Sequence, residues 1–169
     1  MTDLQQINET PKRPVFLLVL VILSSINIGV STIGSLTAVL GAKPDAEMVK
    51  KALLDYAEMR EQLEKAGAAD YTYIVDQMQT VTTHMFAHFH TYNAIQLVFL
   101  LLGLTGVIFM YQRKRLGFHF YIVYSIGLVL LPYFFNSMNQ IPTILTVVGV
   151  LYGAVWVFMY GRNLHWINQ

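Results

Sequence analysis

Four long stretches of this sequence contain no aspartate, glutamate, lysine or arginine. They cover residues 15–41, 85–111, 116–135 and 141–160. Each is long enough to cross a bilayer as a helix, which takes about 20 residues. The chain is 55% hydrophobic and only 12% charged, whereas about a quarter of the residues of a soluble domain are charged. The sequence therefore predicts an all-α integral membrane protein, a single membrane domain with four transmembrane helices.

The first of these stretches follows Lys12 and Arg13 and has two interpretations. A positive start before an apolar run is also typical of a cleaved signal peptide. The apolar part of a signal peptide is only about 7 to 15 residues long, much shorter than residues 15–41. We therefore expect a permanent span.

Charged residues return at residues 43–84, between the first and second spans. Asp45 is a candidate N-cap and Gly67 a candidate C-terminal stop of a helix. Apolar residues between them recur at helical spacing, namely Val49, Ala52, Leu53, Tyr56, Met59, Leu63 and Ala66. This pattern predicts an extramembrane helical hairpin at residues 43–84. Its apolar stripe, with Leu53 and Met59 as candidate interface residues, needs something to pack against.

A second helical pattern begins at Asp70 and continues into the second apolar stretch without a helix breaker. One helix over residues 71–111 would be about 60 Å long, twice the hydrocarbon core of about 30 Å. We expect the excess length to project into water beside the first helix of the hairpin.

Basic residues outside the spans predict the orientation of the chain. On a four-span path one side receives Lys12, Arg13, Arg113, Lys114, Arg115 and Arg162. The hairpin on the other side carries five basic and eight acidic residues. Basic loops stay in the cytoplasm, so both termini are expected to be cytoplasmic. The chain has no cysteine, which favours a bacterial inner membrane over a disulfide-stapled cell-surface protein.

The absence of certain residues and motifs argues against several functions. The spans contain no acidic or basic residue for an ion to bind, which argues against an ion-coupled transporter. A net charge of +1 with no basic stripe argues against nucleic-acid binding. No catalytic motif is present, so we expect no catalytic residue and no enzymatic activity.

A histidine cluster, His84, His88 and His90, stands near the start of the second span. Helical residues turn about 100° each, so His84 and His88 share a face and His90 does not. These two are the candidate metal or haem ligands, although a third ligand such as Asp76 would have to come from elsewhere. A pH-sensitive role and polar packing are the alternatives. Polar packing is the expected role, with no cofactor.

Small and polar residues form seams on two spans. The first span carries Ser24, Asn27, Ser31, Gly34, Ala38 and Gly41 at steps of three and four, and the fourth carries Thr146, Gly149, Gly153 and Trp156. Small side chains let membrane helices approach closely. We expect these seams to pack inside the bundle, with contacts to another subunit as the alternative. Polar Tyr92, Asn93 and Gln96 in the second span would hydrogen-bond another helix or line a small-molecule pocket.

The leading hypothesis is a non-enzymatic membrane component. It would be a homo-oligomer or a small subunit of a larger inner-membrane complex, with lipid and other membrane subunits as its partners. One alternative is an oligomeric pore or uncoupled transporter. The other is a haem- or metal-binding redox subunit that uses His84 and His88.

Overall fold

The computed structural model describes residues 14–167, and this part of the chain forms helices without any strand. Four helices are long and apolar enough to cross a membrane, as the sequence predicts. The α-helices are α1 (Val15–Leu40), α2 (Ala46–Lys65), α3 (Thr72–Ala87), α4 (Phe89–Tyr111), α5 (Leu116–Leu130), α6 (Thr143–Gly161) and α7 (Leu164–Ile167), and the 3-10 helices are η1 (Ala69–Tyr71), η2 (Leu131–Phe134) and η3 (Met138–Gln140).

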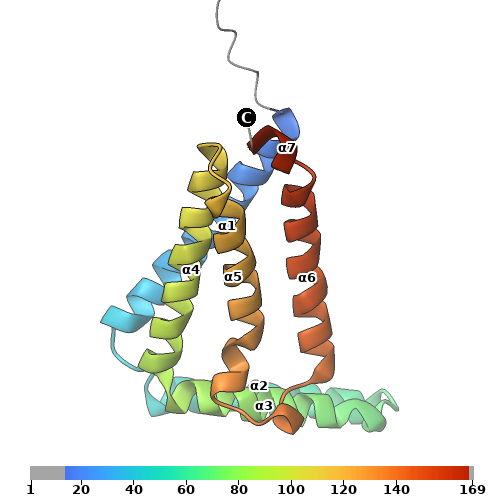
Figure 1. Cartoon of the computed structure of the whole chain (residues 1–169). Helices are drawn as coiled ribbons and strands as arrows, with labels where there is room; N and C mark the ends of the chain where they lie inside the picture. Colours follow the sequence, from blue (N-terminus) through green and yellow to red (C-terminus); the bar gives the residue numbers. More distant parts are fainter. Residues whose placement is uncertain (1–13, 168–169) are drawn as a thin grey trace, which may run out of the picture.

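The four apolar helices are α1, α4, α6 and α5 continued by η2. They run between two ends of the molecule, and α2 and α3 lie crosswise over one of these ends (Figure 1). The start of α1, the turn from α4 to α5, and α7 lie at the opposite end (Figure 1). At that end the Arg113 guanidinium lies 4.5 Å from the centre of the Trp166 ring, which links the α4–α5 turn to α7.

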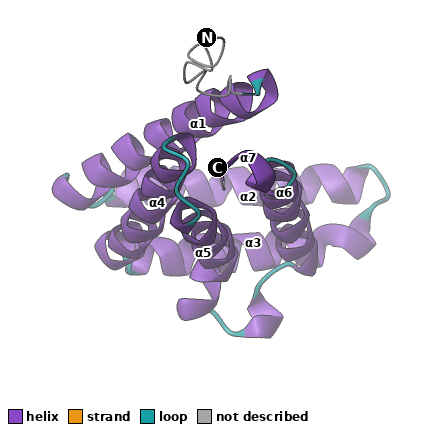
Figure 2. Ribbon diagram, turned by 45° about the horizontal axis from the view of Figure 1, so that its top comes forward, coloured by secondary structure: helices purple, strands orange, loops and turns teal. Residues whose placement is uncertain are grey.

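The single projecting helix expected over residues 71–111 is wrong. Helix α3 ends at Ala87, and His88 leaves the helical conformation with φ −107° and ψ 32°. The second apolar helix therefore begins at Phe89 rather than at residue 85. Because α3 turns away from the axis of α4, it lies across the ends of α5 and α6 (Figure 2).

Side-chain contacts hold α3 in this crosswise position. Gln77 Nε2 donates to the Asn139 carbonyl at 2.7 Å, and His84 Nδ1 lies 2.7 Å from Asn136 Oδ1. Val75 is only 3% exposed. A helix that continued straight into water would lose these hydrogen bonds, so the bend at His88 brings α3 onto the segment between α5 and α6.

The two end signals of α2 are as the sequence predicts. The Asp45 carboxylate accepts a hydrogen bond from the Met48 N–H at 2.7 Å. Gly67 follows the helix with φ +73°, a left-handed conformation that glycine adopts without steric cost. Helix α2 then packs beside α3, and the Tyr56 hydroxyl lies 2.8 Å from Thr82 Oγ1.

The closest helix contact in the bundle is between α4 and α5, where glycines bring the two backbones together. A Cβ atom on Gly117 would lie 2.5 Å from the Gly106 carbonyl oxygen, and one on Gly103 would lie 2.6 Å from the Tyr124 ring. Helix α1 packs mainly on α4, and α6 packs mainly on α5. The α4–α5 pair is therefore the centre of the bundle, and α1 and α6 pack against it.

Gly117→Ala should destabilise the protein, because its Cβ would force α4 and α5 apart. Overpacking of this kind costs about 1–3 kcal/mol. Gly34→Ala is the matched control, since a Cβ at Gly34 would meet nothing within 4 Å. Thermal unfolding of both variants in detergent checks this. Equal melting temperatures for the two variants would contradict the close α4–α5 contact.

Candidate functional site

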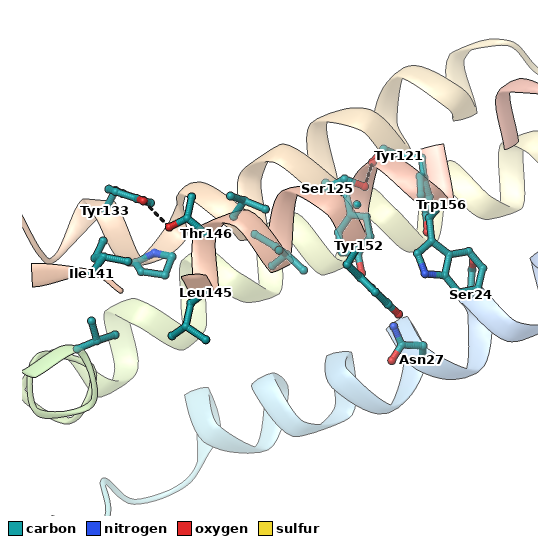
Figure 3. Close-up of a pocket in the computed structure, with 17 residues that line it drawn as sticks. Ser24, Asn27, Tyr121, Ser125, Tyr133, Ile141, Leu145, Thr146, Tyr152 and Trp156 are labelled. Carbon is teal, nitrogen blue, oxygen red and sulfur yellow. Dashed lines mark hydrogen bonds between the residues drawn. The ribbon is translucent and has the colours of Figure 1, made fainter. Parts of the chain in front are cut away.

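A pocket of about 250 Å³ lies between α1, α5 and α6, with α3 across one end of it (Figure 3). Helix α5 with the residues after it forms one wall, α6 forms another, and α1 contributes two residues. The lining residues are Ser24, Asn27, Val81, Tyr121, Tyr124, Ser125, Leu128, Val129, Pro132, Tyr133, Ile141, Leu145, Thr146, Gly149, Tyr152, Gly153 and Trp156.

At the end toward α7, a buried hydrogen bond joins α1 to α6. The Tyr160 hydroxyl donates to Ser24 Oγ at 3.0 Å, and both residues are buried. The Tyr121 ring of α5 packs on the Tyr160 ring with centroids 4.8 Å apart. Three helices therefore meet at this end and close the pocket there.

At the opposite end, α3 and the segment between α5 and α6 form the floor. The Tyr133 hydroxyl and Thr146 Oγ1 lie 2.6 Å apart and connect η2 to α6. Val81 of α3 and Ile141 line the pocket at this end. Helix α3 is held here by Asn136 and Asn139 of the same segment, so the hairpin position decides the shape of the pocket floor.

Between these two closed ends, α1 and α6 stand apart. Asn27, halfway along α1, and Tyr152 of α6 point toward one another across the pocket (Figure 3). Both side chains are exposed. Among residues 14–167 no hydrogen-bond partner is found for the Asn27 carboxamide or for the Tyr124 and Tyr152 hydroxyls. The pocket thus has a side opening bordered by polar groups that are free to bind something else.

The lining is mainly apolar and carries several polar groups but no charge. Its hydrogen-bonding side chains are serine, threonine and tyrosine hydroxyls, one carboxamide and the Trp156 indole, and no acidic, basic or histidine side chain lines it. These groups can donate and accept hydrogen bonds. They offer no counter-charge to an ion and no residue with an ordinary pKa near neutrality for acid–base catalysis.

The residues predicted to form interfaces are only partly brought together. Ser24, Asn27, Gly149 and Gly153 line the pocket. The two glycines pack on α5, because a Cβ on Gly149 would lie 3.4 Å from Val129 and one on Gly153 would lie 3.5 Å from Ser125. Outside the pocket lie Ser31, Gly34 and Ala38 of α1, with Leu53 and Met59 of α2.

The histidines do not line the pocket. His84 is bonded to Asn136, and the His88 ring lies 5.4 Å from the Phe135 ring, so both side chains face the segment after η2. His90 is exposed. Within residues 14–167 no group of three or more histidine, aspartate or glutamate residues is placed to hold a metal ion. His84 thus makes the kind of contact that polar packing requires.

The polar residues of the second span also lie away from the pocket. The Asn93 carboxamide donates to the Phe89 carbonyl of its own helix at 2.8 Å. The Tyr92 ring packs near Phe135, with centroids 5.6 Å apart.

Sequence reasoning missed the tyrosines that dominate the lining. Tyr124 and Tyr152 lie near the middle of apolar stretches, whereas tyrosines of membrane helices usually gather near the two interfaces. Tyr121 and Tyr124 are also three residues apart, which places them on one side of α5. Their depth within the stretches was the available signal.

The fold and the pocket together define a class: helical proteins with four apolar helices, three of which line a largely apolar pocket that carries uncharged polar groups. Compared with protein-family models, curated proteins and solved structures, the chain matches none.

Tyr160→Phe should lower the melting temperature in detergent, because it removes the Tyr160–Ser24 hydrogen bond at the junction of α1 and α6. One hydrogen bond contributes about 0.5–1.5 kcal/mol. Tyr152→Phe is the control, since its hydroxyl has no partner among residues 14–167. Combining Tyr160→Phe with Ser24→Ala should cost less than the two single changes added together. Strict additivity would show that the hydrogen bond contributes nothing.

Proposed function

We propose that this chain is a non-enzymatic, multi-pass membrane protein that binds a small bilayer-borne molecule in the pocket between α1, α5 and α6. The side opening of the pocket is the observation that carries the proposal. It lies about halfway along α1, whose bounds are Val15–Leu40, so in a bilayer it opens into hydrocarbon and not into water. A ligand of this pocket would enter from the lipid.

The distribution of apolar and charged side chains supports this placement. Helices α1 and α6 expose many leucine, isoleucine and valine side chains along their lengths, as helices in contact with lipid do. Helix α2 has a polar average character and no buried residue. Tyr56 of its apolar stripe contacts Thr82 of α3, and its charged side belongs in water or among lipid headgroups.

Energetics favour an occupied pocket. The Asn27 carboxamide and the Tyr152 hydroxyl are exposed halfway along their helices without hydrogen-bond partners among residues 14–167. Leaving one such group unpaired in an apolar medium costs about 1–3 kcal/mol on protein scales. A molecule that pairs with both groups recovers this free energy, and hydrocarbon tails cannot do so.

A second membrane subunit is the other candidate occupant of the open side. The face of α1 that carries Asn27 continues through Ser31, Gly34 and Ala38, and a Cβ at Gly34 would meet nothing within 4 Å. A helix of another copy, or of a different subunit, would find small residues there. Because the chain has no cysteine, Gly34→Cys gives one defined crosslinking site. Rapid crosslinking at Gly34→Cys, with little at Leu36→Cys, an exposed position about 200° around α1 from Gly34, would favour this candidate.

The topology that we propose places both termini in the cytoplasm of a bacterial inner membrane and the α2–α3 hairpin outside. Reporters fused after the last residue and at Arg113 should read cytoplasmic, and reporters at Gly67 and Asn139 should read external, because basic residues are retained inside. A cytoplasmic signal at Gly67 would contradict the four-span topology.

A pocket-filling variant tests ligand binding. Leu128→Trp places an indole in the cavity, whereas Leu101→Trp is the control on α4, where Leu101 is 47% exposed and outside the pocket. Organic extracts of protein purified in mild detergent should contain a lipid-like molecule in near-stoichiometric amount. That molecule should be lost from Leu128→Trp and kept in Leu101→Trp. Equal extracts from both variants would argue against binding in this pocket.

A further inference from the structure

The geometry points to the chemical class of the ligand, an inference that rests on the proposed function. We infer that the pocket takes a neutral molecule whose planar ring carries a carbonyl or hydroxyl oxygen and whose apolar tail leaves between α1 and α6. Three features of the pocket support this class: its missing charge, its aromatic walls and its unpaired polar groups.

The missing charge excludes an ionic head. None of the residues that line the pocket is acidic, basic or a histidine. A phosphate or carboxylate inside it would lose its hydration without gaining a counter-ion, a cost far larger than that of a neutral polar group. Phospholipids and fatty acids therefore fit the pocket with their tails only.

The aromatic walls favour a flat ring. On α5 the Tyr121 and Tyr124 rings lie 5.4 Å apart at 61°, and on α6 the Tyr152 and Trp156 rings lie 6.2 Å apart at 63°. Aromatic side chains bind other rings by stacked or edge-to-face contact. A cavity of about 150 Å³ suffices to bind benzene, and the cavity here, about 250 Å³, leaves room for ring substituents.

The unpaired polar groups come from three helices. The Asn27 carboxamide of α1, the Tyr124 hydroxyl of α5 and the Tyr152 hydroxyl of α6 all line the pocket. Each can donate a hydrogen bond to a carbonyl oxygen, and each can also accept one from a hydroxyl. A ring with oxygens on opposite sides would pair with groups on both walls, whereas an aliphatic chain would pair with none.

The path of the tail follows from where α1 and α6 meet. They are joined by Tyr160 and Ser24 near α7, and they separate toward the hairpin end (Figure 1). A tail attached to a ring in the pocket therefore leaves through the side, below the Ser24–Tyr160 hydrogen bond. It would then lie along α6, which exposes Leu145, Val148 and Leu151.

Tryptophan fluorescence tests this inference. The chain has two tryptophans; Trp156 lines the pocket, and Trp166 is buried at the α7 end. Trp166→Phe leaves Trp156 as the reporter, titrated with a decyl-substituted benzoquinone in phospholipid nanodiscs. Quenching should saturate. Tyr152→Phe and Asn27→Leu, each made in this background, should weaken the apparent affinity about five- to tenfold, the effect of losing one hydrogen bond.

Two variants serve as controls. Tyr73→Phe removes a hydroxyl from a tyrosine that is 57% exposed, as Tyr152 is, but lies on α3 outside the pocket, so the affinity should not change. Trp156→Phe, which keeps Trp166, should show only weak quenching that rises linearly. If Trp166→Phe does not fold, the quenching curve of Trp156→Phe is subtracted from that of the native chain. The difference is the quenching of Trp156.

Two further probes separate the inference from the proposed function on which it rests. One probe is a bromine-labelled long-chain alcohol and the other is bromine-labelled phosphatidylglycerol. If the quenching saturates with the alcohol but not with the benzoquinone, the pocket binds a ligand and the inferred ring is wrong. If it saturates with phosphatidylglycerol but not with the benzoquinone, the inferred neutral head is wrong. No saturation with any probe would overturn both proposals. Saturation by the benzoquinone that is unchanged in Tyr152→Phe and Asn27→Leu would overturn the assigned contacts.

Discussion

The backbone contact between α4 and α5 is the constraint on which the rest of the structure depends. Gly106 and Gly117 let these helices approach so closely that a single Cβ would meet the opposite carbonyl oxygen at 2.5 to 2.8 Å. Such proximity increases the dispersion contacts between the two helices, and packing of this kind is what holds helices together in a bilayer. The other apolar helices pack on this pair, α1 on α4 and α6 on α5. Because α1 packs on α4 and α6 packs on α5, α1 and α6 do not have to contact one another along their lengths.

The pocket is a consequence of this arrangement. Helices α1 and α6 meet at the Tyr160–Ser24 hydrogen bond, and the space that opens below it is walled by α5 and floored by α3. Helix α6 rests on α5 through Gly149 and Gly153, which supply contact without bulk. The same small residues that permit packing therefore leave volume beside them, and the tyrosines of α5 and α6 fill that volume only in part.

Local signals in the sequence predict local features of this fold. Long uncharged stretches must be helical in lipid because every backbone polar group needs a partner, and the Asp45 cap and the Gly67 stop depend on neighbours three to five residues away. No proline or glycine near His88 predicts the bend at this residue. The bend depends on contacts of His84 and Gln77 with Asn136 and Asn139, which are more than fifty residues distant in the chain. Periodicity likewise placed Ser24 and Asn27 on one face of α1 but could not say that Tyr160 would bind one and that the other would remain unpaired.

The separation of α1 from α6 also gives the molecule two unequal ends. At one end α1, α6 and α7 lie together, and at the other the helices spread above the crosswise hairpin (Figure 1). In the membrane placement that we propose, a body of this shape would occupy a larger area in one leaflet of the bilayer than in the other. A curved membrane, in which the leaflet at the narrow end is the more compressed one, would match this difference in area. The protein would thus prefer one sign of membrane curvature, and this preference would be set by the angle at which α1 leaves Ser24.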